Sequence, residues 1–166
     1  RIGLKETLEA IRNHPNYKIP LGPNQGRGIA TGFWFNIAES SSATVNLTED
    51  GTAVVITGSP DIGGSRASMA LMAAEELGID PKLIQPLVGD TEAVGFTDVT
   101  EGSRATFATG LAVVRACQKL VIQLKERASI MWECSVDDIE WVDGSAVHKE
   151  GKESPLTIAK ITGKAK

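Results

Sequence analysis

Two short stretches of this chain share a pattern of glycine, serine and arginine that suits the binding of an anion. Gly64-Ser65-Arg66-Ala67-Ser68 recurs further along as Gly102-Ser103-Arg104-Ala105-Thr106, and a helical pattern follows each copy. The first N–H groups of a helix have no partner within the helix, and glycine lets the backbone approach a ligand closely. The repeat therefore predicts two helix starts that cradle an anion such as a phosphate.

Ordinary helix capping explains either copy alone equally well. Ser65 and Ser103 are expected N-cap residues, because a serine hydroxyl accepts from early helical N–H groups. In that interpretation Arg66 and Arg104 only pair with neighbouring carboxylates. Two copies after successive strands favour the anion site, since both helix starts then lie at one end of the sheet. Each dipole would add about 0.3–1 kcal/mol for a bound anion.

The other polar residues do not form a second recognisable site in the sequence. His14 and His148 are expected at the surface, in a turn and in a hairpin. Cys117 and Cys134 form no CxxC pair, so we expect two reduced, mostly buried thiols rather than a metal centre. Neither a G-x-S-x-G elbow nor a P-loop occurs. The acidic loop 89–102 is interpreted as solvated charge rather than acid–base machinery.

Length and composition limit the function classes. The 166 residues are 42% hydrophobic, enough for a core, and the net charge of −4 argues against a nucleic-acid surface. No apolar run approaches the length of a membrane span, and no signal peptide is visible, so a cytoplasmic protein is expected. Because the chain starts at Arg1 and stops in the beginning of a helix, we expect a fragment of a longer protein.

Hydrophobic periodicity predicts the elements that position these stretches. Their order favours an α+β fold, a two-layer α/β sandwich with a mixed sheet and two helices on one face around a β-β-α-β-α core. Gly110, inside a helix, predicts a close contact with a strand or the other helix. We expect an N-terminal helix and connector over 1–25 and one domain over 26–166. The predicted helices are 4–13, 65–77, 103–133 and 157–161, and the predicted strands are 29–36, 43–48, 52–57, 83–88, 139–142 and 146–148.

From Gly26 to Gly144 the chain resembles the molybdenum-binding large subunit of the xanthine dehydrogenase, aldehyde oxidase and carbon monoxide dehydrogenase family. The matching motifs keep the family's order and a sensible spacing. They are Gly28-Ile29-Ala30-Thr31-Gly32, Ser42-Ala43-Thr44-Val45-Asn46-Leu47, Asp50-Gly51, Thr57-Gly58-Ser59-Pro60-Asp61-Ile62-Gly63-Gly64-Ser65, Ala73-Ala74-Glu75-Glu76-Leu77-Gly78, Asp90-Thr91 and Gly102-Ser103-Arg104.

The resemblance implies a molybdopterin cofactor with molybdenum, often as the cytosine dinucleotide in bacterial members. It implies hydroxylation of a carbon in an aldehyde or N-heterocycle. It also implies partners: the remaining part of the large subunit, and 2Fe-2S and FAD groups on partner subunits or domains that carry the electrons away. In such enzymes the protein positions the cofactor through loops, and the cofactor supplies the chemistry.

The resemblance also implies which residues meet the cofactor, motif by motif. The family's Gly-Gln-Gly loop, its Asp-Thr pair and its second cofactor loop correspond here to Gly63, Gly64 and Ser65, to Asp90 and Thr91, and to Gly102, Ser103 and Arg104.

The chain departs from the family's pattern at two places. Gly64 stands where the family has its glutamine, which suggests a different subgroup or substrate. The family's catalytic glutamate lies in a Gly-Glu-Pro segment, and none occurs in this sequence. We therefore assign no catalytic residue and no metal ligand, and expect this chain to be inactive alone. A non-catalytic α/β interaction module is the alternative, and a generic nucleotide-binding domain is a third, weaker one.

Overall fold

The computed structural model describes residues 3–163, which divide between Phe33 and Trp34 into two compact units. In the first unit, helix α1 spans Leu4–Asn13, as predicted. The sequence placed the domain boundary at residue 26 instead, and that division stays a prediction.

A three-stranded sheet forms the centre of the second unit. Its strands are β1 (Ala43–Leu47), β2 (Ala53–Thr57) and β3 (Ile84–Val88), in the order β1-β2-β3. The first two form the predicted antiparallel hairpin, and β3 runs parallel to β2. Pro86 therefore lies in an edge strand, where its missing N–H costs no interior ladder bond.

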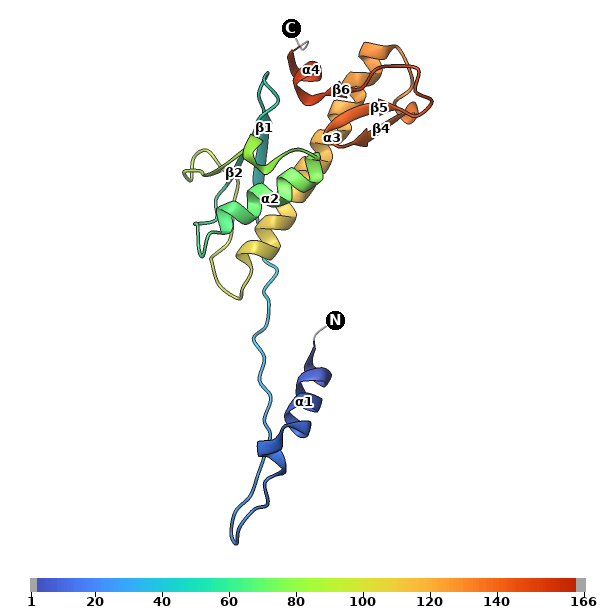
Figure 1. The fold of residues 1–166 in the computed structure, drawn as a ribbon. Helices are drawn as coiled ribbons and strands as arrows, with labels where there is room; N and C mark the ends of the chain where they lie inside the picture. The colour runs from blue at the N-terminus through green and yellow to red at the C-terminus, as the bar shows by residue number, and fades with distance from the viewer. Residues whose placement is uncertain (1–2, 164–166) are drawn as a thin grey trace. The chain divides into compact units, whose positions relative to one another are not determined.

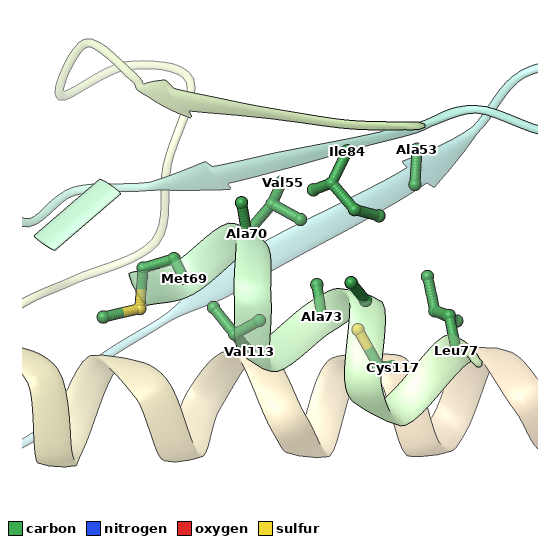
Figure 2. Close-up of a cluster of buried hydrophobic side chains, with 10 residues drawn as sticks. Ala53, Val55, Met69, Ala70, Ala73, Leu77, Ile84, Val113 and Cys117 are labelled. Atoms are coloured by element: carbon green, nitrogen blue, oxygen red, sulfur yellow. The ribbon is translucent and has the colours of Figure 1, made fainter. Parts of the chain in front are cut away.

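Helices α2 (Ser65–Leu77) and α3 (Gly110–Trp132) cover one face of this sheet (Figure 1). Figure 2 shows how the buried side chains of the strands point toward both helices. Ala53 and Val55 of β2 lie two residues apart, so they share that face and join one core with Val113 of α3. The two-layer arrangement confirms the predicted fold class.

Gly110 explains why the two helices come so close together. A Cβ atom at this position would lie 2.5 Å from the Sδ atom of Met72 in α2. Glycine in a helix costs about 1 kcal/mol against alanine, and here the missing side chain leaves room for Met72 between the two helices. The contact expected at Gly110 is confirmed.

A second small sheet packs near the C-terminal half of α3 (Figure 1). It contains β4 (Ile139–Val142), β5 (Ser145–His148) and β6 (Leu156–Thr157), and helix α4 (Ile158–Gly163) follows. The last helix, predicted from residue 157, therefore starts one residue later, because Thr157 pairs with Ser145 of β5.

His148 corrects a second expectation for this region. It is buried rather than exposed, with 5% of its surface accessible. Its ring lies 6.3 Å from that of Trp132, and its Nδ1 accepts from the Glu150 N–H. The histidine is thus part of the packing between α3 and the hairpin.

Two further predictions are corrected by the structure. Residues 29–36 form no strand, and within either compact unit the described residues give this segment no backbone hydrogen bond. The helix predicted from residue 103 starts with a π-helical turn, Ala105–Thr109, before α3.

The helical stretch Ala105–Trp132 also has the length and hydropathy of a membrane span, contrary to the expectation that no run approaches one. It buries Val113 and Cys117 against the sheet and α2, and it exposes Arg115 and Lys119. The helix thus packs one face in the domain, while Leu111, Ile122 and Ile130 are among its exposed apolar residues.

Both cysteines are free, and Cys117 is fully buried. Burial, and secondarily the charge of Glu76, raises the pKa of the Cys117 thiol from 9.0 to about 11. This rise of two pKa units lowers the thiolate fraction of Cys117 about a hundredfold near pH 8.

We expect iodoacetamide to alkylate Cys117 at least about a hundredfold more slowly in the native full-length protein than in the urea-unfolded protein, as measured by peptide mass spectrometry. Equal rates would contradict the buried thiol.

Candidate cofactor site

The first predicted loop ends in two glycines with left-handed backbone. Gly63 and Gly64 have φ values of 61° and 80°, and Gly64 is the N-cap of α2. The predicted cap at Ser65 is therefore wrong, since Ser65 is already helical and its Oγ accepts from the Ile62 N–H at 3.2 Å. The serine braces the loop instead of capping the helix.

The start of α2 is less open to an anion than the sequence suggests. Asp61 Oδ1 accepts from the Arg66 N–H at 3.0 Å, and Asp61 Oδ2 lies 2.9 Å from Arg66 Nε. This hydrogen bond from the Arg66 backbone lowers the pKa of the Asp61 carboxyl. The Ala67 N–H donates to Gly64 C=O. A carboxylate of the chain itself thus occupies the place that the dipole argument gave to a ligand.

The second loop also has two consecutive residues in the left-handed region. Gly102 and Ser103 have φ values of 54° and 56°. Ser103 does not cap the following helix, which corrects the second predicted cap; the residue before the π-helical turn is Arg104. A Cβ at Gly102 would lie 2.5 Å from Ile37 Cγ1, so only glycine fits this turn without displacing the segment beside it.

Arg104 is the largest fully buried side chain in the structure, with 0% of its surface accessible. Its Nη1 donates to the carbonyl oxygens of Asp98 and Val99, at 2.9 and 3.1 Å. Its Nη2 donates to the carbonyl oxygens of Glu39 and Ser40 and to Ser41 Oγ. The guanidinium therefore ties two segments, 39–41 and 98–99, to the second loop.

Polar partners extend this buried network. Ser41 Oγ lies 3.1 Å from Thr109 Oγ1, which lies 2.8 Å from Ser59 Oγ. Arg104 Nε and Glu39 Oε2 stand 3.8 Å apart, too far for a hydrogen bond, and neither atom has one. The network joins the first loop, the second loop and the lead into β1. Sequence reasoning missed it, because nothing local distinguishes Arg104 from Arg66.

Sheet topology brings the two loops to the same edge. Strands β2 and β3 are parallel neighbours, so their carboxyl ends coincide, and the Gly89 N–H donates to Thr57 C=O at 2.9 Å across those ends. A hollow of about 490 Å³ is lined by Ile62 of the first loop and by residues 100–106 of the second, with Trp34 at the same hollow. Gly102, Ser103 and Arg104 are among the lining residues, whereas Gly63, Gly64 and Ser65 are not.

Asp90 and Thr91 lie apart from this hollow, at the exposed beginning of the long loop after β3. Asp90 Oδ1 accepts from the N–H groups of Glu92 and Ala93, at 3.0 and 2.7 Å. In this structure the carboxylate therefore shapes its own turn.

The loops offer backbone donors that suit a phosphate-bearing cofactor. Among residues 3–163, no hydrogen-bond acceptor pairs with the N–H groups of Gly63, Gly64, Gly102 or Ser103. A Cβ at Gly63 or Gly64 would meet nothing within 4 Å, so a ligand can approach this backbone closely. Consecutive left-handed residues with free N–H groups form anion-binding concavities, so these residues fit the phosphate of such a cofactor.

No group of three or more His, Cys, Asp or Glu side chains capable of holding a metal ion occurs in the described part of the chain. Among the described residues, Arg104 is the buried ionisable side chain that lines the hollow, and its guanidinium stays protonated and donates to its own protein acceptors. What the arrangement offers is therefore the positioning of a large ligand by backbone groups.

Comparison with known proteins agrees with this arrangement. The family described as "Molybdopterin cofactor-binding domain" matches residues 7–166. The carbon monoxide dehydrogenase large chain of Hydrogenophaga pseudoflava is 31% identical over 101 residues, which are 60% of this chain and 13% of that protein. The molybdenum-binding subunit PaoC of the Escherichia coli K12 aldehyde oxidoreductase is 36% identical over 99 residues, 57% of this chain and 13% of the subunit.

The fold matches solved structures of the same kind. A Cu,Mo-CO dehydrogenase structure superposes with a TM-score of 0.70 at 26% identity, covering 75% of this chain and 16% of the other. The chain thus spans about a seventh of the length of these relatives. It belongs to the molybdopterin cofactor-binding domain family, as a piece of a molybdenum-binding large subunit of the xanthine dehydrogenase, aldehyde oxidase and carbon monoxide dehydrogenase type.

Proposed function

We propose that this chain forms one wall of the cofactor site in a molybdenum hydroxylase, and that the whole enzyme hydroxylates an aldehyde or an N-heterocycle. The observation that carries the proposal is the hollow where Ile62 meets the turn at Gly102 and Ser103, at the carboxyl ends of two parallel strands. When bound, the cofactor supplies the oxidation chemistry through molybdenum. The chain's own residues bind and orient it.

The names of relatives support the proposed substrate class. PaoC belongs to an aldehyde oxidoreductase. The nicotine 6-hydroxylase large subunit of Paenarthrobacter nicotinovorans is 31% identical over 121 residues, 72% of this chain and 15% of that protein. One relative thus acts on an aldehyde and one on an N-heterocycle.

The residues of the site divide by role. The unpaired N–H groups of Gly63, Gly64, Gly102 and Ser103 donate to the cofactor's phosphate and pterin. Ser65 and Arg104 act behind them by fixing the two loops. Asp90 and Thr91 complete the site from the long loop, whose own turn Asp90 already shapes.

The remaining parts of the enzyme belong to the same proposal. Residues 26–166 belong to the cofactor-binding domain, and the cofactor carries a cytosine dinucleotide in the bacterial manner. The rest of the large subunit closes the site, and 2Fe-2S and FAD groups on partner subunits or domains accept the electrons. We place the assembled enzyme in the cytoplasm.

Metal and pterin analysis of the purified full-length protein tests this function. We expect about one molybdenum per large subunit and a fluorescent pterin oxidation product. A protein that is correctly folded, is expressed in a host that makes the cofactor, and contains neither would support the non-catalytic interaction module instead.

The first loop is tested by Gly63→Leu in the full-length protein. A leucine side chain at Gly63 would fill the open approach to the loop, so we expect molybdenum content to fall about tenfold, which corresponds to about 1.4 kcal/mol of lost binding. Gly151→Leu is the matched control, because Gly151 has φ 68° against 61° for Gly63 and is equally open. Both variants carry the same backbone strain. An equal loss of molybdenum in the two variants would therefore contradict a role of the first loop in binding the cofactor.

A further inference from the structure

The turn that leads into α3 determines where the side chain of Thr109 points. This turn is π-helical over Ala105–Thr109, so its backbone hydrogen bonds join residues five apart. In an α-helix, two side chains five residues apart point about 140° away from one another. In a π-helical turn they lie nearly one turn apart, on the same side of the chain. Arg104, just before the turn, and Thr109, at its end, can therefore face the same neighbour.

Ser41 is the neighbour that both side chains contact. Arg104 Nη2 donates to Ser41 Oγ at 2.6 Å, and Thr109 Oγ1 lies 3.1 Å from the same oxygen. Thr109 Oγ1 also lies 2.8 Å from Ser59 Oγ, at the start of the first loop. Arg104 and Thr109 are fully buried, and Ser59 is 6% exposed. A line of polar groups thus runs through the interior from the second loop to the first.

The charge of Arg104 gives this line of hydrogen bonds a direction. A hydroxyl that accepts from a guanidinium becomes a better donor, because hydrogen-bonded groups in the interior polarise one another. This favours donation from Ser41 to Thr109 and from Thr109 to Ser59. Among residues 3–163, no hydrogen bond joins residues 58–64 directly to residues 39–41 or 98–104. Thr109 is therefore the residue at which the hydrogen-bond networks of the two loops meet.

We propose that Thr109 is a positioning residue that couples the two cofactor loops, so that the ordering of either loop stabilises the other. Its side chain does not line the hollow, so it acts through Ser41 and Ser59 rather than on the cofactor. A cofactor that orders one loop would then find the other loop already in place, which lowers the entropic cost of binding. The role of Thr109 in cofactor binding rests on the proposed function, whereas the coupling of the loops does not.

Hydrogen exchange of the full-length large subunit, resolved to single amides, measures this coupling. The reporters beside the second loop are the Ile37 and Arg104 N–H groups, which donate to the carbonyl oxygens of Gly102 and Glu101 at 3.0 and 3.1 Å. The substitution Ser59→Ala alters the first loop alone. We expect it to speed exchange at both reporters about fivefold, because it removes one buried hydrogen-bond partner. Unchanged exchange at the reporters would overturn the coupling, and this test needs no change at the π-helical turn.

The substitution Thr109→Val tests whether the effect passes through the threonine hydroxyl, because valine keeps the shape of threonine. In the Thr109→Val background, Ser59→Ala is expected to cause no further change at the two reporters. Equal effects of Ser59→Ala in both backgrounds would refute a role of Thr109. Thr109→Ser retains the hydroxyl and should preserve the response to Ser59→Ala. Thr44→Val, the same chemical change at an exposed position of β1, should preserve it as well.

The molybdenum content of the same proteins shows whether the coupling serves the cofactor. We expect about fivefold less molybdenum per folded subunit in Thr109→Val than in the unaltered protein, since the two loops would then have to be ordered separately. Thr109→Ser and Thr44→Val should retain nearly normal content. Equal molybdenum content in Thr109→Val and Thr44→Val would contradict a role of Thr109 in cofactor binding.

Failure of the coupling differs visibly from failure of the proposed function. A full-length protein that contains molybdenum but shows no response of Ile37 and Arg104 to Ser59→Ala overturns the coupling alone. A protein without molybdenum or pterin that shows this response supports the coupling and overturns the proposed function.

Discussion

Replacement of Arg104 by methionine is expected to lower the free energy of unfolding by about 3–5 kcal/mol, the usual cost of removing one member of a buried charged network. The guanidinium is fully buried and donates to four carbonyl oxygens and one hydroxyl. Methionine fills much of the volume but donates nothing, so these acceptors would be left without partners. Urea unfolding of the full-length protein, read by hydrogen exchange on peptides from α2 and α3, measures the loss.

The repeated motif supplies a matched control for this experiment. Arg66 occupies the same place in its copy, but its side chain is 52% exposed and pairs with Asp61 at the surface. Arg66→Met should therefore cost no more than about 1 kcal/mol. Arg104→Lys keeps the charge but loses the planar fork, so its cost should fall between the two. Equal losses for Arg66→Met and Arg104→Met would contradict the role given to the network.

The Gly78→Ala substitution is expected to lower the free energy of unfolding by about 2–5 kcal/mol. About 1–2 kcal/mol of this comes from the left-handed backbone and about 1–3 kcal/mol from overpacking. Gly78 ends α2 with φ 71°, and a Cβ there would lie 2.6 Å from the Gly144 nitrogen. Gly144, with φ 72°, would in turn place a Cβ 2.8 Å from Gly78 C=O. The backbone of the β4–β5 turn cannot move aside as a flexible side chain can.

The same urea experiment tests this contact, with Gly151→Ala as control. Gly151 has φ 68° and nothing within 4 Å, so its variant carries only the backbone cost of about 1–2 kcal/mol. Because Gly78 and Gly144 touch, the double alanine variant should lose less than the sum of the single variants. Two results would contradict a tight contact between the two turns. One is that the losses of the two single variants add fully in the double variant, and the other is that Gly78→Ala costs no more than Gly151→Ala.

Elements governed by local rules could be predicted from the sequence. The hairpin around Asp50-Gly51 and the end of α2 at Gly78 depend on residues that favour left-handed backbone, and both formed as expected. The close contact at Gly110 was equally predictable, since glycine inside a helix requires a reason.

The features that the sequence missed depended on partners far along the chain. Ser65 and Ser103 are residue types that commonly cap helices. Because left-handed residues precede both helices, the N-cap positions are Gly64 and Arg104 instead. Arg66 and Arg104 have nearly the same neighbours, yet only Arg104 finds acceptors from residues 39–41 around it. Local sequence does not contain that information, because burial is decided by which segments meet in three dimensions.

Helix α3 gives the second unit a mechanical property that neither sheet has alone. Its 23 residues extend about 35 Å, and its buried side chains join one core through Val113 and the other through Leu124. Leu120 packs against both cores. If the C-terminal sheet opened locally, the C-terminal half of α3 would lose its packing partners. The helix would then be less stable along its whole length, including its beginning beside Arg104. We therefore expect this sheet, which carries none of the candidate site residues, to unfold together with the two candidate loops.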